Sequence, residues 1–386
     1  MKVLLQRTRY LIAGLFLLII SCAKIQLQNQ AILHHFFPNW TMYGGNPART
    51  NSYPGHINLP LKLLWQQSTS AAVGKTILIS DGIIFFSTME GNIYAYSIGN
   101  GEKIGRVKTE FHATQIVKDS ILIIARRYGD DTLFKYQLKT GKFDWGFNAG
   151  DIASEPLIFD NQIVVTALYN HIDLYDLSTS ERIWQTNVDD HIHSSPATDG
   201  NIIVFGCDDN FIYAVNYNDG EIIWKFKTNA SVQATPVIFD QTVFIGSSDK
   251  NFYALDLASG EEKWHFSVNG KILQAAAVND SLVIFGATDE HIYCLDRKSG
   301  DRKWTFKAGS VISTCPLICD DKVFFGSLDH HYYGLDVASG KEIWKYKTKG
   351  RVRTAPVIWG NYFIGASEDH HLYVFSSAEE IEFDSK

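Results

Sequence analysis

The stretch ALDLASGEEKW (residues 254–264) reappears along the chain as GLDVASGKEIW (residues 334–344). Its tryptophan recurs seven times along the chain, at intervals of about forty residues: Trp65, Trp145, Trp184, Trp224, Trp264, Trp304 and Trp344. The one double interval contains a degenerate copy, NGEKIG (residues 100–105), in which Gly105 holds the tryptophan position. A period of 40–45 residues is typical of a β-propeller, in which each repeat forms one four-stranded blade.

Each copy predicts four short strands with turn signals between them. In the copy that ends at Trp264, the pair Ser259-Gly260 is suited to a tight hairpin, because glycine adopts positive φ without strain. Eight tryptophan-type strands and eight groups of three inner strands can be counted, if Gly105 is included. The last group, residues 353–375, has no tryptophan strand after it, and the strand at Trp65 has no group before it. We therefore expect an all-β, eight-bladed propeller whose N-terminal strand completes the last blade and closes the ring.

The repeated phrase resembles the tryptophan-docking motif of the pyrroloquinoline-quinone-type β-propeller superfamily. The segment NWTMYGGNPART (residues 39–50) is similar to the one that opens such propellers, and the resemblance extends from about residue 40 to about residue 375. It implies that the seven tryptophans pack between neighbouring blades and are structural. Physical chemistry agrees, because a buried tryptophan supplies a large apolar contact and an N–H group that requires a partner.

The first residues have the pattern of a targeting segment. Lys2, Arg7 and Arg9 precede an apolar run of ten residues (11–20), which is too short for a permanent membrane span. The run ends in LIISC, which resembles a bacterial lipobox and predicts that Cys22 receives a diacylglycerol and a further acyl chain such as palmitate. The alternative is an ordinary secretory signal with an incidental cysteine. Ala23, in place of the aspartate of inner-membrane retention signals, favours the outer membrane.

These signals divide the chain into four parts. We expect a lipoprotein signal peptide over residues 1–21, a tether over residues 22–38, the propeller over residues 39–376 and an acidic tail over residues 377–386. The sequence contains no second globular domain, and we expect the propeller itself to be monomeric.

The charge balance does not favour a nucleic-acid partner. The formal net charge is −7, and removal of Lys2, Arg7 and Arg9 with the signal leaves 32 basic against 42 acidic residues, a net −10. No basic stripe of the kind that binds nucleic acid is evident. Apart from Cys22, the cysteines are Cys207, Cys294, Cys315 and Cys319, and we interpret them as isolated core residues. Cys315 and Cys319 lie about 13 Å apart if they share a strand, which is too far for a disulfide.

The mouth of the central channel is the candidate site for ligands or partners. Alignment of the innermost strands on their prolines places eight residues there: Gly74, His112, Ala153, His193, Gln233, Leu273, Ser313 and Arg353. Of these, we single out His112, His193, Gln233 and Arg353 as the candidate channel-mouth residues. The resemblance would suggest a quinone held with calcium by carboxylate and amide oxygens, but this set has no carboxylate and no tryptophan. We expect no catalytic residues and no cofactor.

Histidines recur in one column of the repeat, directly after a column of acidic residues. The histidines are His171, His291, His331 and His371. The acidic residues are expected to satisfy the amides of a hairpin turn. Since the histidines stand on separate blades, whereas zinc requires ligands about 2 Å from one ion, we predict no metal site. A polar patch at residues 329–331 and 369–371 is the alternative that would allow one.

The cofactor-free lipoproteins of this superfamily include a component of the outer-membrane β-barrel assembly complex, and the size, blade number and anchor here are most similar to that branch. The resemblance implies a non-catalytic scaffold that binds protein partners, is attached to the outer membrane by lipid and faces the periplasm. Another cell-surface binding or sensory propeller lipoprotein is the alternative, followed by a quinone-dependent dehydrogenase.

Overall fold

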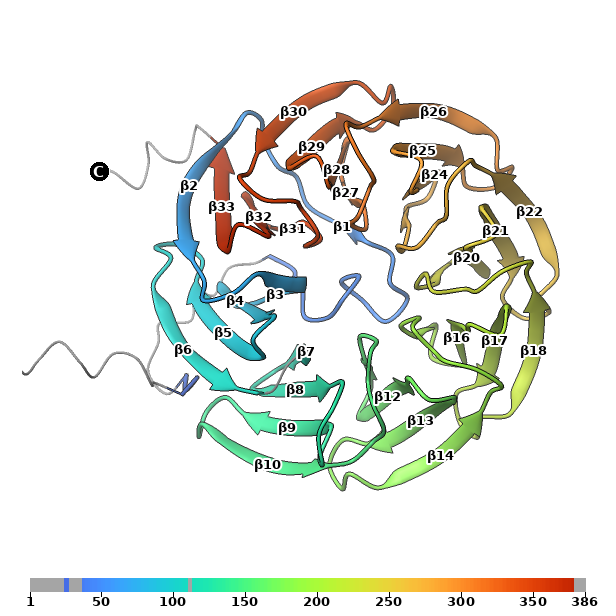
Figure 1. Ribbon diagram of the computed structural model, residues 1–386, viewed down its shortest axis with the longest axis horizontal. Coiled ribbons are helices and arrows are strands. Elements are labelled where there is room, and N and C mark those ends of the chain that lie inside the picture. Colours follow the sequence, from blue (N-terminus) through green and yellow to red (C-terminus); the bar gives the residue numbers. More distant parts are fainter. Residues whose placement is uncertain (1–23, 28–36, 110–112, 378–386) are drawn as a thin grey trace, which may run out of the picture.

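Each repeat forms a four-stranded antiparallel sheet in the computed structural model, which describes residues 24–27, 37–109 and 113–377. Eight such sheets are arranged as blades around a central axis (Figure 1). Within a blade, the strand nearest the axis is buried, whereas the outermost strand alternates between exposed and half-buried residues. No helix occurs among the described residues, and none of that part of the chain could therefore cross a membrane as a long apolar helix.

The first four blades follow the chain in order from the innermost to the outermost strand. Blade 1 contains β3 (Val73–Ser80), β4 (Ile83–Thr88), β5 (Asn92–Ser97) and β6 (Lys103–Lys108). Blade 2 contains β7 (Ala113–Lys118), β8 (Ile121–Arg126), β9 (Leu133–Gln137) and β10 (Lys142–Phe147). Blade 3 contains β11 (Leu157–Phe159), β12 (Gln162–Ala167), β13 (His171–Asp176) and β14 (Arg182–Asn187). Blade 4 contains β15 (Ala197–Thr198), β16 (Ile202–Gly206), β17 (Phe211–Asn216) and β18 (Ile222–Lys227).

The next three blades repeat this plan. Blade 5 contains β19 (Val237–Phe239), β20 (Thr242–Gly246), β21 (Asn251–Asp256) and β22 (Glu262–Ser267). Blade 6 contains β23 (Ala277–Val278), β24 (Leu282–Gly286), β25 (His291–Asp296) and β26 (Arg302–Lys307). Blade 7 contains β27 (Leu317–Cys319), β28 (Lys322–Ser327), β29 (His331–Asp336) and β30 (Glu342–Lys347).

Blade 8 joins the two ends of the propeller. Its three inner strands are β31 (Val357–Trp359), β32 (Tyr362–Ser367) and β33 (His371–Ser377), and its outermost strand is β2 (Leu61–Ser68). β2 pairs antiparallel with β33, with Trp65 opposite Val374. The predicted fold is therefore confirmed: eight blades, with the N-terminal strand completing the last one, so that the ring has no open seam in its sheets.

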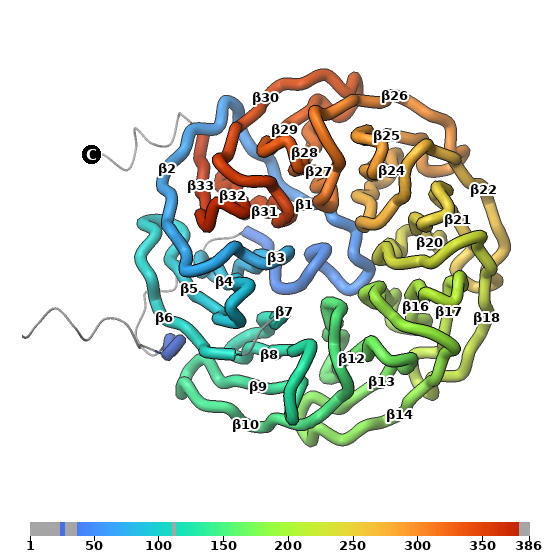
Figure 2. Tube along the Cα trace, viewed as in Figure 1, coloured from blue at the N-terminus to red at the C-terminus, as the bar shows by residue number. Residues whose placement is uncertain are grey.

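The segment from Trp40 to Tyr53 crosses the middle of the ring (Figure 2), a path that the repeat pattern did not predict. Trp40 bridges to Ile79 of blade 1, and the carbonyl groups of this central segment then accept hydrogen bonds from the inner strands of further blades. Its end, β1 (Ser52–Tyr53), pairs in parallel with β27 and adds a fifth strand to blade 7. The central segment thus ties separate blades together from inside the channel.

Candidate functional site

The tryptophans form a belt between blades, each contacting the blade that follows. The indole N–H of Trp224, for example, donates to the carbonyl of Leu257 at 2.9 Å, and the ring lies over Gly260. A Cβ atom on Gly260 would come within 2.6 Å of that ring, and the glycine has φ +73°, so this position requires glycine for two reasons. The equivalent indole donor is present at Trp65, Trp145, Trp184, Trp264, Trp304 and Trp344.

The seven tryptophans are not equally enclosed. Trp184, Trp224 and Trp344 are buried, whereas the other four are half-buried. Trp145 lies at the least regular junction, where Ser180 takes the place of the turn glycine and keeps its positive φ of 64°. Its indole donates to the carbonyl of Leu177 at 3.3 Å, the same length as the bond from Trp344 to Leu61.

The slot that lacks a tryptophan, at Gly105, is filled by the chain's own N-terminal segment. A Cβ atom on Gly105 would lie 2.7 Å from the carbonyl oxygen of Lys24 and 2.9 Å from Cα of Ile25. The amide of Leu27 donates to the carbonyl of Leu138 at 2.9 Å, and Leu138 stands thirty-three residues after Gly105. Leu257 has the same spacing from Trp224, so this backbone amide takes the acceptor that an indole uses elsewhere in the belt.

Two further contacts hold this segment, which we call the docked segment (Lys24–Leu27). Ile25 is fully buried, and its carbonyl accepts a hydrogen bond of 2.9 Å from the hydroxyl of Tyr136. At Gly141, in the turn that a tryptophan would cover, an added Cβ atom would lie 3.7 Å from Ile25 and Gln26 of the docked segment instead. We call the junction of β6, β10 and the docked segment the anchor seam. Cys22 itself lies outside the described residues, and its lipidation remains a prediction.

The channel mouth contains a cavity of only about 60 Å³. Ala153, His193, Gln233 and Leu273, four of the residues placed there by the repeat alignment, line this cavity. His112 lies outside the described residues. Arg353 does not line the cavity, and it pairs with Glu368 at 2.7 Å instead.

The polar groups at the mouth are engaged with acidic partners from the same repeat position. His193 Nδ1 lies 3.0 Å from one oxygen of Asp208, and the Gln233 side-chain amide donates to the other oxygen at 3.0 Å. Glu368, in the equivalent position of blade 8, accepts from both Arg351 and Arg353. His193 and Arg353 are thus each paired with a carboxylate at the same position of the repeat.

A buried arginine and a glutamate beneath the mouth were not predicted from the sequence. Arg49 of the central segment is fully buried and donates to the carbonyls of Pro196, Glu155 and Pro156. Burial lowers the pKa of Arg49 to about 10, although the nearby Glu155 opposes this effect. Burial raises the pKa of Glu155, because it disfavours the charged carboxylate. The hydrogen bond from Thr76 and the charge of Arg49 oppose this effect. The bonds from Arg49 to these carbonyls tie the central segment to blades 3 and 4.

One signal in the sequence could have revealed Glu155. It directly precedes the aligned proline of its repeat, where the next two copies have Ser195 and Thr235. It is the one carboxylate in this column, and its backbone amide donates to the hydroxyl oxygen of Ser195 at 2.9 Å. No comparable signal marks Arg49, because the central segment lies outside the repeat.

The histidine and aspartate columns serve local structure. Asp249 accepts from the amides of Asn251 and Asn229 and from the hydroxyl of Tyr253, which satisfies the hairpin as expected. His291, His331 and His371 each place Nδ1 against the carbonyl of the aspartate two residues earlier. His171 pairs with Asp173 at 2.8 Å. The described histidines of this column therefore do not converge on a common point.

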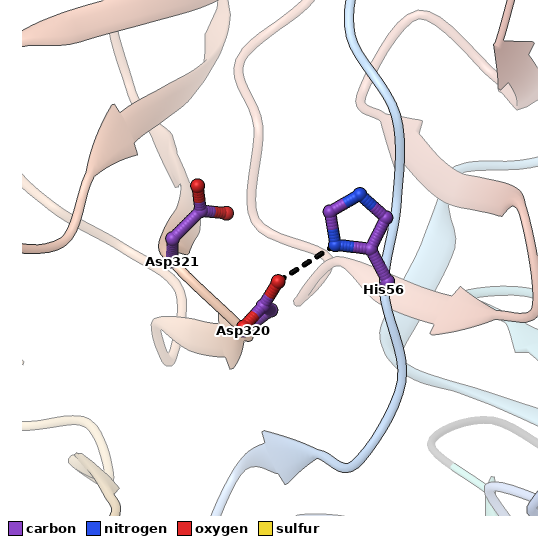
Figure 3. A group of neighbouring side chains, drawn as sticks. All are labelled: His56, Asp320 and Asp321. Atoms are coloured by element: carbon purple, nitrogen blue, oxygen red, sulfur yellow. Dashed lines mark hydrogen bonds and ion pairs between the residues drawn. The ribbon is translucent and has the colours of Figure 1, made fainter.

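One group in the described part of the chain has the composition of a metal site: His56, Asp320 and Asp321 (Figure 3). All three side chains are exposed. His56 uses Nδ1 for Asp320 at 2.7 Å and Nε2 for Asn58 at 2.8 Å, so both ring nitrogens have partners. Asp321 is also paired, with Lys322. This surface cluster gives no further indication of a ligand.

The cavity described at the channel mouth is too small for a quinone with a bound metal ion. Sites for cofactor-sized ligands enclose roughly 300–1,000 Å³, far more than the cavity at this mouth. Of its two nearby carboxylates, Asp208 is bound by His193 and Gln233. Glu155 accepts from Thr76 through Oε1, while its Oε2 is buried without a partner. The four buried cysteines among the described residues, Cys207, Cys294, Cys315 and Cys319, form no disulfide.

The ring of eight tryptophan-docked blades around a filled channel defines a propeller of the pyrroloquinoline-quinone repeat type. The model of the family described as "Outer membrane protein assembly factor BamB" matches residues 62–226, 208–319 and 288–380, so the chain belongs to this family. No curated protein matches the sequence significantly.

Solved structures share the fold at low sequence identity. BamB from Moraxella catarrhalis has a TM-score of 0.71 and 17% identity, over 82% of this chain and 100% of that one. The computationally designed Ika8 protein has a TM-score of 0.73 and 17% identity, over 80% and 98% of the two chains. Quinohemoprotein alcohol dehydrogenase from Comamonas testosteroni has a TM-score of 0.76 and 14% identity, over 88% and 80%. At these identities the likeness concerns the fold alone.

Proposed function

We propose that the protein is a non-catalytic scaffold for outer-membrane β-barrel protein assembly, attached to the outer membrane by lipid on Cys22 and facing the periplasm. The observation that carries this proposal is the family match, which extends over residues 62–380. The filled channel supports it, since the cavity of about 60 Å³ at the mouth leaves no space for a cofactor-sized ligand. The protein then acts by binding other proteins on its surface.

The face around the channel mouth is the proposed side for the partner. His193 and Arg353 are exposed there, next to the half-buried Gln233, and each has a carboxylate partner that fixes its position. Fixed polar groups reduce the conformational entropy that binding costs, and they favour one orientation of the partner. His112 belongs to the same proposal, although it lies outside the described residues.

Crosslinking in intact cells tests the assembly role. A photo-reactive amino acid placed at Arg353 reports on the mouth face, and one placed at the exposed Ile223 of β18 serves as a control on the rim. We expect Arg353 to crosslink to the barrel-inserting component of the assembly complex, and Ile223 to do so much less. Capture of a sugar-uptake or signalling complex by Arg353 would contradict the assembly role and favour a sensory propeller.

A quinone-dependent dehydrogenase is the competing function, because the fold is shared with such enzymes. Purified protein supplied with quinone and calcium should show no dye-linked oxidation of alcohols or sugars above the rate without protein. Turnover that requires both additions would contradict the scaffold proposal.

A further inference from the structure

The docked segment brings the N-terminus to a defined place on the propeller rim. Lys24 lies against Gly105 of β6, and it stands two residues after Cys22. Two residues of extended chain span at most about 7 Å. A lipid on Cys22 would therefore be attached directly beside the anchor seam and not at the end of a long tether.

A pocket with a basic lining opens at the same place. Its volume is about 430 Å³, and its cationic residues are Lys24, Arg106, Lys108 and Lys142. Within the described parts of the chain, none of these four side chains makes an ion pair or a hydrogen bond. The carboxylate on β10, Asp144, is bound by Lys135 and Gln137. The anchor seam thus has unpaired positive charge in a protein whose net charge is −7.

The basic residues of other rim strands are engaged differently. Lys225 and Lys227 of β18 occupy the repeat positions of Arg106 and Lys108. The ammonium group of Lys225 lies 4.9 Å from the ring centre of Tyr213, and that of Lys227 lies 5.9 Å from the ring centre of Phe211. On β26, Lys303 and Lys307 form ion pairs with Asp296 and Glu290. The unpaired cluster therefore distinguishes the anchor seam from these strands.

We propose that the anchor seam binds the headgroups of anionic phospholipids, so that the propeller stands with this edge on the membrane. Lysine and arginine side chains at an anionic surface each strengthen binding roughly fivefold, and the exposed aromatic ring of Phe143 beside the pocket suits the headgroup boundary. Both faces of the ring would then remain accessible to partners. The proposal rests on the proposed function for the lipid on Cys22, but the charge of the seam does not depend on it.

Vesicle binding by the soluble mature chain with Cys22→Ser tests the seam without a lipid anchor. We expect this protein to sediment with phosphatidylcholine vesicles that contain phosphatidylglycerol, but not with pure phosphatidylcholine, and to be released by salt. The double variant Arg106→Gln/Lys108→Gln should lower the partition coefficient by roughly 25-fold, as two charges at about fivefold each would give. Lys225→Gln/Lys227→Gln provides the matched control, because β18 lies across the ring from β6 (Figure 1), and it should bind like the parent.

Equal binding to both kinds of vesicle would overturn the proposal, and so would an equal loss in the two double variants. Circular dichroism and the thermal midpoint of each variant establish that it is folded. The anchor is measured separately, by labelling the wild-type protein in cells with a palmitate analogue. Absence of label contradicts the lipid anchor of the proposed function, while selective loss of vesicle binding in Arg106→Gln/Lys108→Gln supports the seam in either case.

Discussion

Blades 3 to 7 and the anchor seam fill the same interblade slot by different means. At the junction of blades 4 and 5, Trp224 reaches over Gly260 and donates to Leu257, entirely within the repeat. At the junction of blades 1 and 2, the repeat has lost its tryptophan, and Ile25 and the amide of Leu27 supply the apolar contact and the donor. The comparison teaches that the slot imposes a physical requirement, which a segment from outside the repeat can meet.

A tryptophan from a regular junction should have the largest effect on stability. Trp224→Ala removes a buried ring and its hydrogen bond, and we expect it to lower the free energy of unfolding by about 3–5 kcal/mol. Trp145→Ala should cost clearly less, because that ring is half-buried and sits at the junction with Ser180. Chemical denaturation of both variants measures the difference. Equal losses would show that the regular and irregular junctions contribute alike.

Substitution of the turn glycines should give the next largest difference in stability between the two regions. Gly260→Ala introduces a Cβ atom 2.6 Å from the ring of Trp224 at a φ of +73°, so strain and overpacking together should cost about 2–4 kcal/mol. Gly141→Ala has nearly the same φ, +67°, but its nearest neighbour is the Tyr136 hydroxyl at 3.5 Å. It should cost only the strain, about 1–2 kcal/mol. If Gly141→Ala were as destabilising as Gly260→Ala, the slot at the anchor seam would be as tightly packed as a tryptophan slot.

Ser180 offers a smaller change in the opposite direction. It has φ +64° at a turn position where the following four copies of the repeat have glycine. Ser180→Gly should relieve this strain and raise the free energy of unfolding by about 1 kcal/mol. The thermal midpoint of Ser180→Gly against wild type measures the gain. A lower midpoint would mean that the serine side chain stabilises the turn more than its backbone strain costs.

Acid should weaken the regular turns before the seam. Hydrogen bonds from the Ser299 amide and from Lys303 lower the pKa of Asp296 to about 2, and Asp256 and Asp336 are shifted in the same direction by similar turn bonds. Since the folded-state pKa lies below that of the unfolded chain, this stabilisation is present above about pH 4 and is lost as the pH falls toward 2. Blades 1 and 2 have Ser97 and Gln137 at this position.

The substitution Asp296→Asn tests this pH dependence. Between pH 4 and pH 2 the variant should lose less free energy of unfolding than wild type does. The difference should be below about 1 kcal/mol, because the carboxylate is exposed and screened. Gln137→Asn, at the same turn position in blade 2, is the control. It changes no charge and should leave the decline of stability between pH 4 and pH 2 unchanged. An unchanged decline in Asp296→Asn would contradict the role of this carboxylate.

The sequence predicted the ring but not what lies inside it or beside its irregular junction. The tryptophan period and the leftover strands at Trp65 and Phe375 were sufficient for eight blades and their closure, because both follow from regular strand pairing. The paths of the docked segment and the central segment follow from contacts of single residues, such as Ile25 and Arg49, which have no period. The absence of a tryptophan at Gly105 was visible, but not the segment that replaces it.

The channel mouth shows the same division. His193 and Gln233 occupy equivalent positions in the repeat and line one cavity, and these positions depend on the strand register. The repeat alignment did not bring in Asp208, which reaches them from the hairpin between β16 and β17. It also did not bring in Glu368, which pairs with Arg353 from the equivalent hairpin of blade 8. Side-chain partners across hairpins depend on rotamers, and the repeat pattern does not encode them.

The most direct test of the docked segment is the exchange rate of the Leu27 amide hydrogen, measured site by site in wild type and in Gly105→Trp. The new side chain would occupy the slot, because a Cβ atom there already lies 2.7 Å from the Lys24 carbonyl oxygen. The Leu27 amide should be protected in wild type and exposed in Gly105→Trp, while the Ile238 amide, bound to Ala48 in the channel, stays protected in both. A Leu27 amide that exchanges freely in wild type, or that remains protected in Gly105→Trp, would contradict the account that this segment replaces the missing tryptophan.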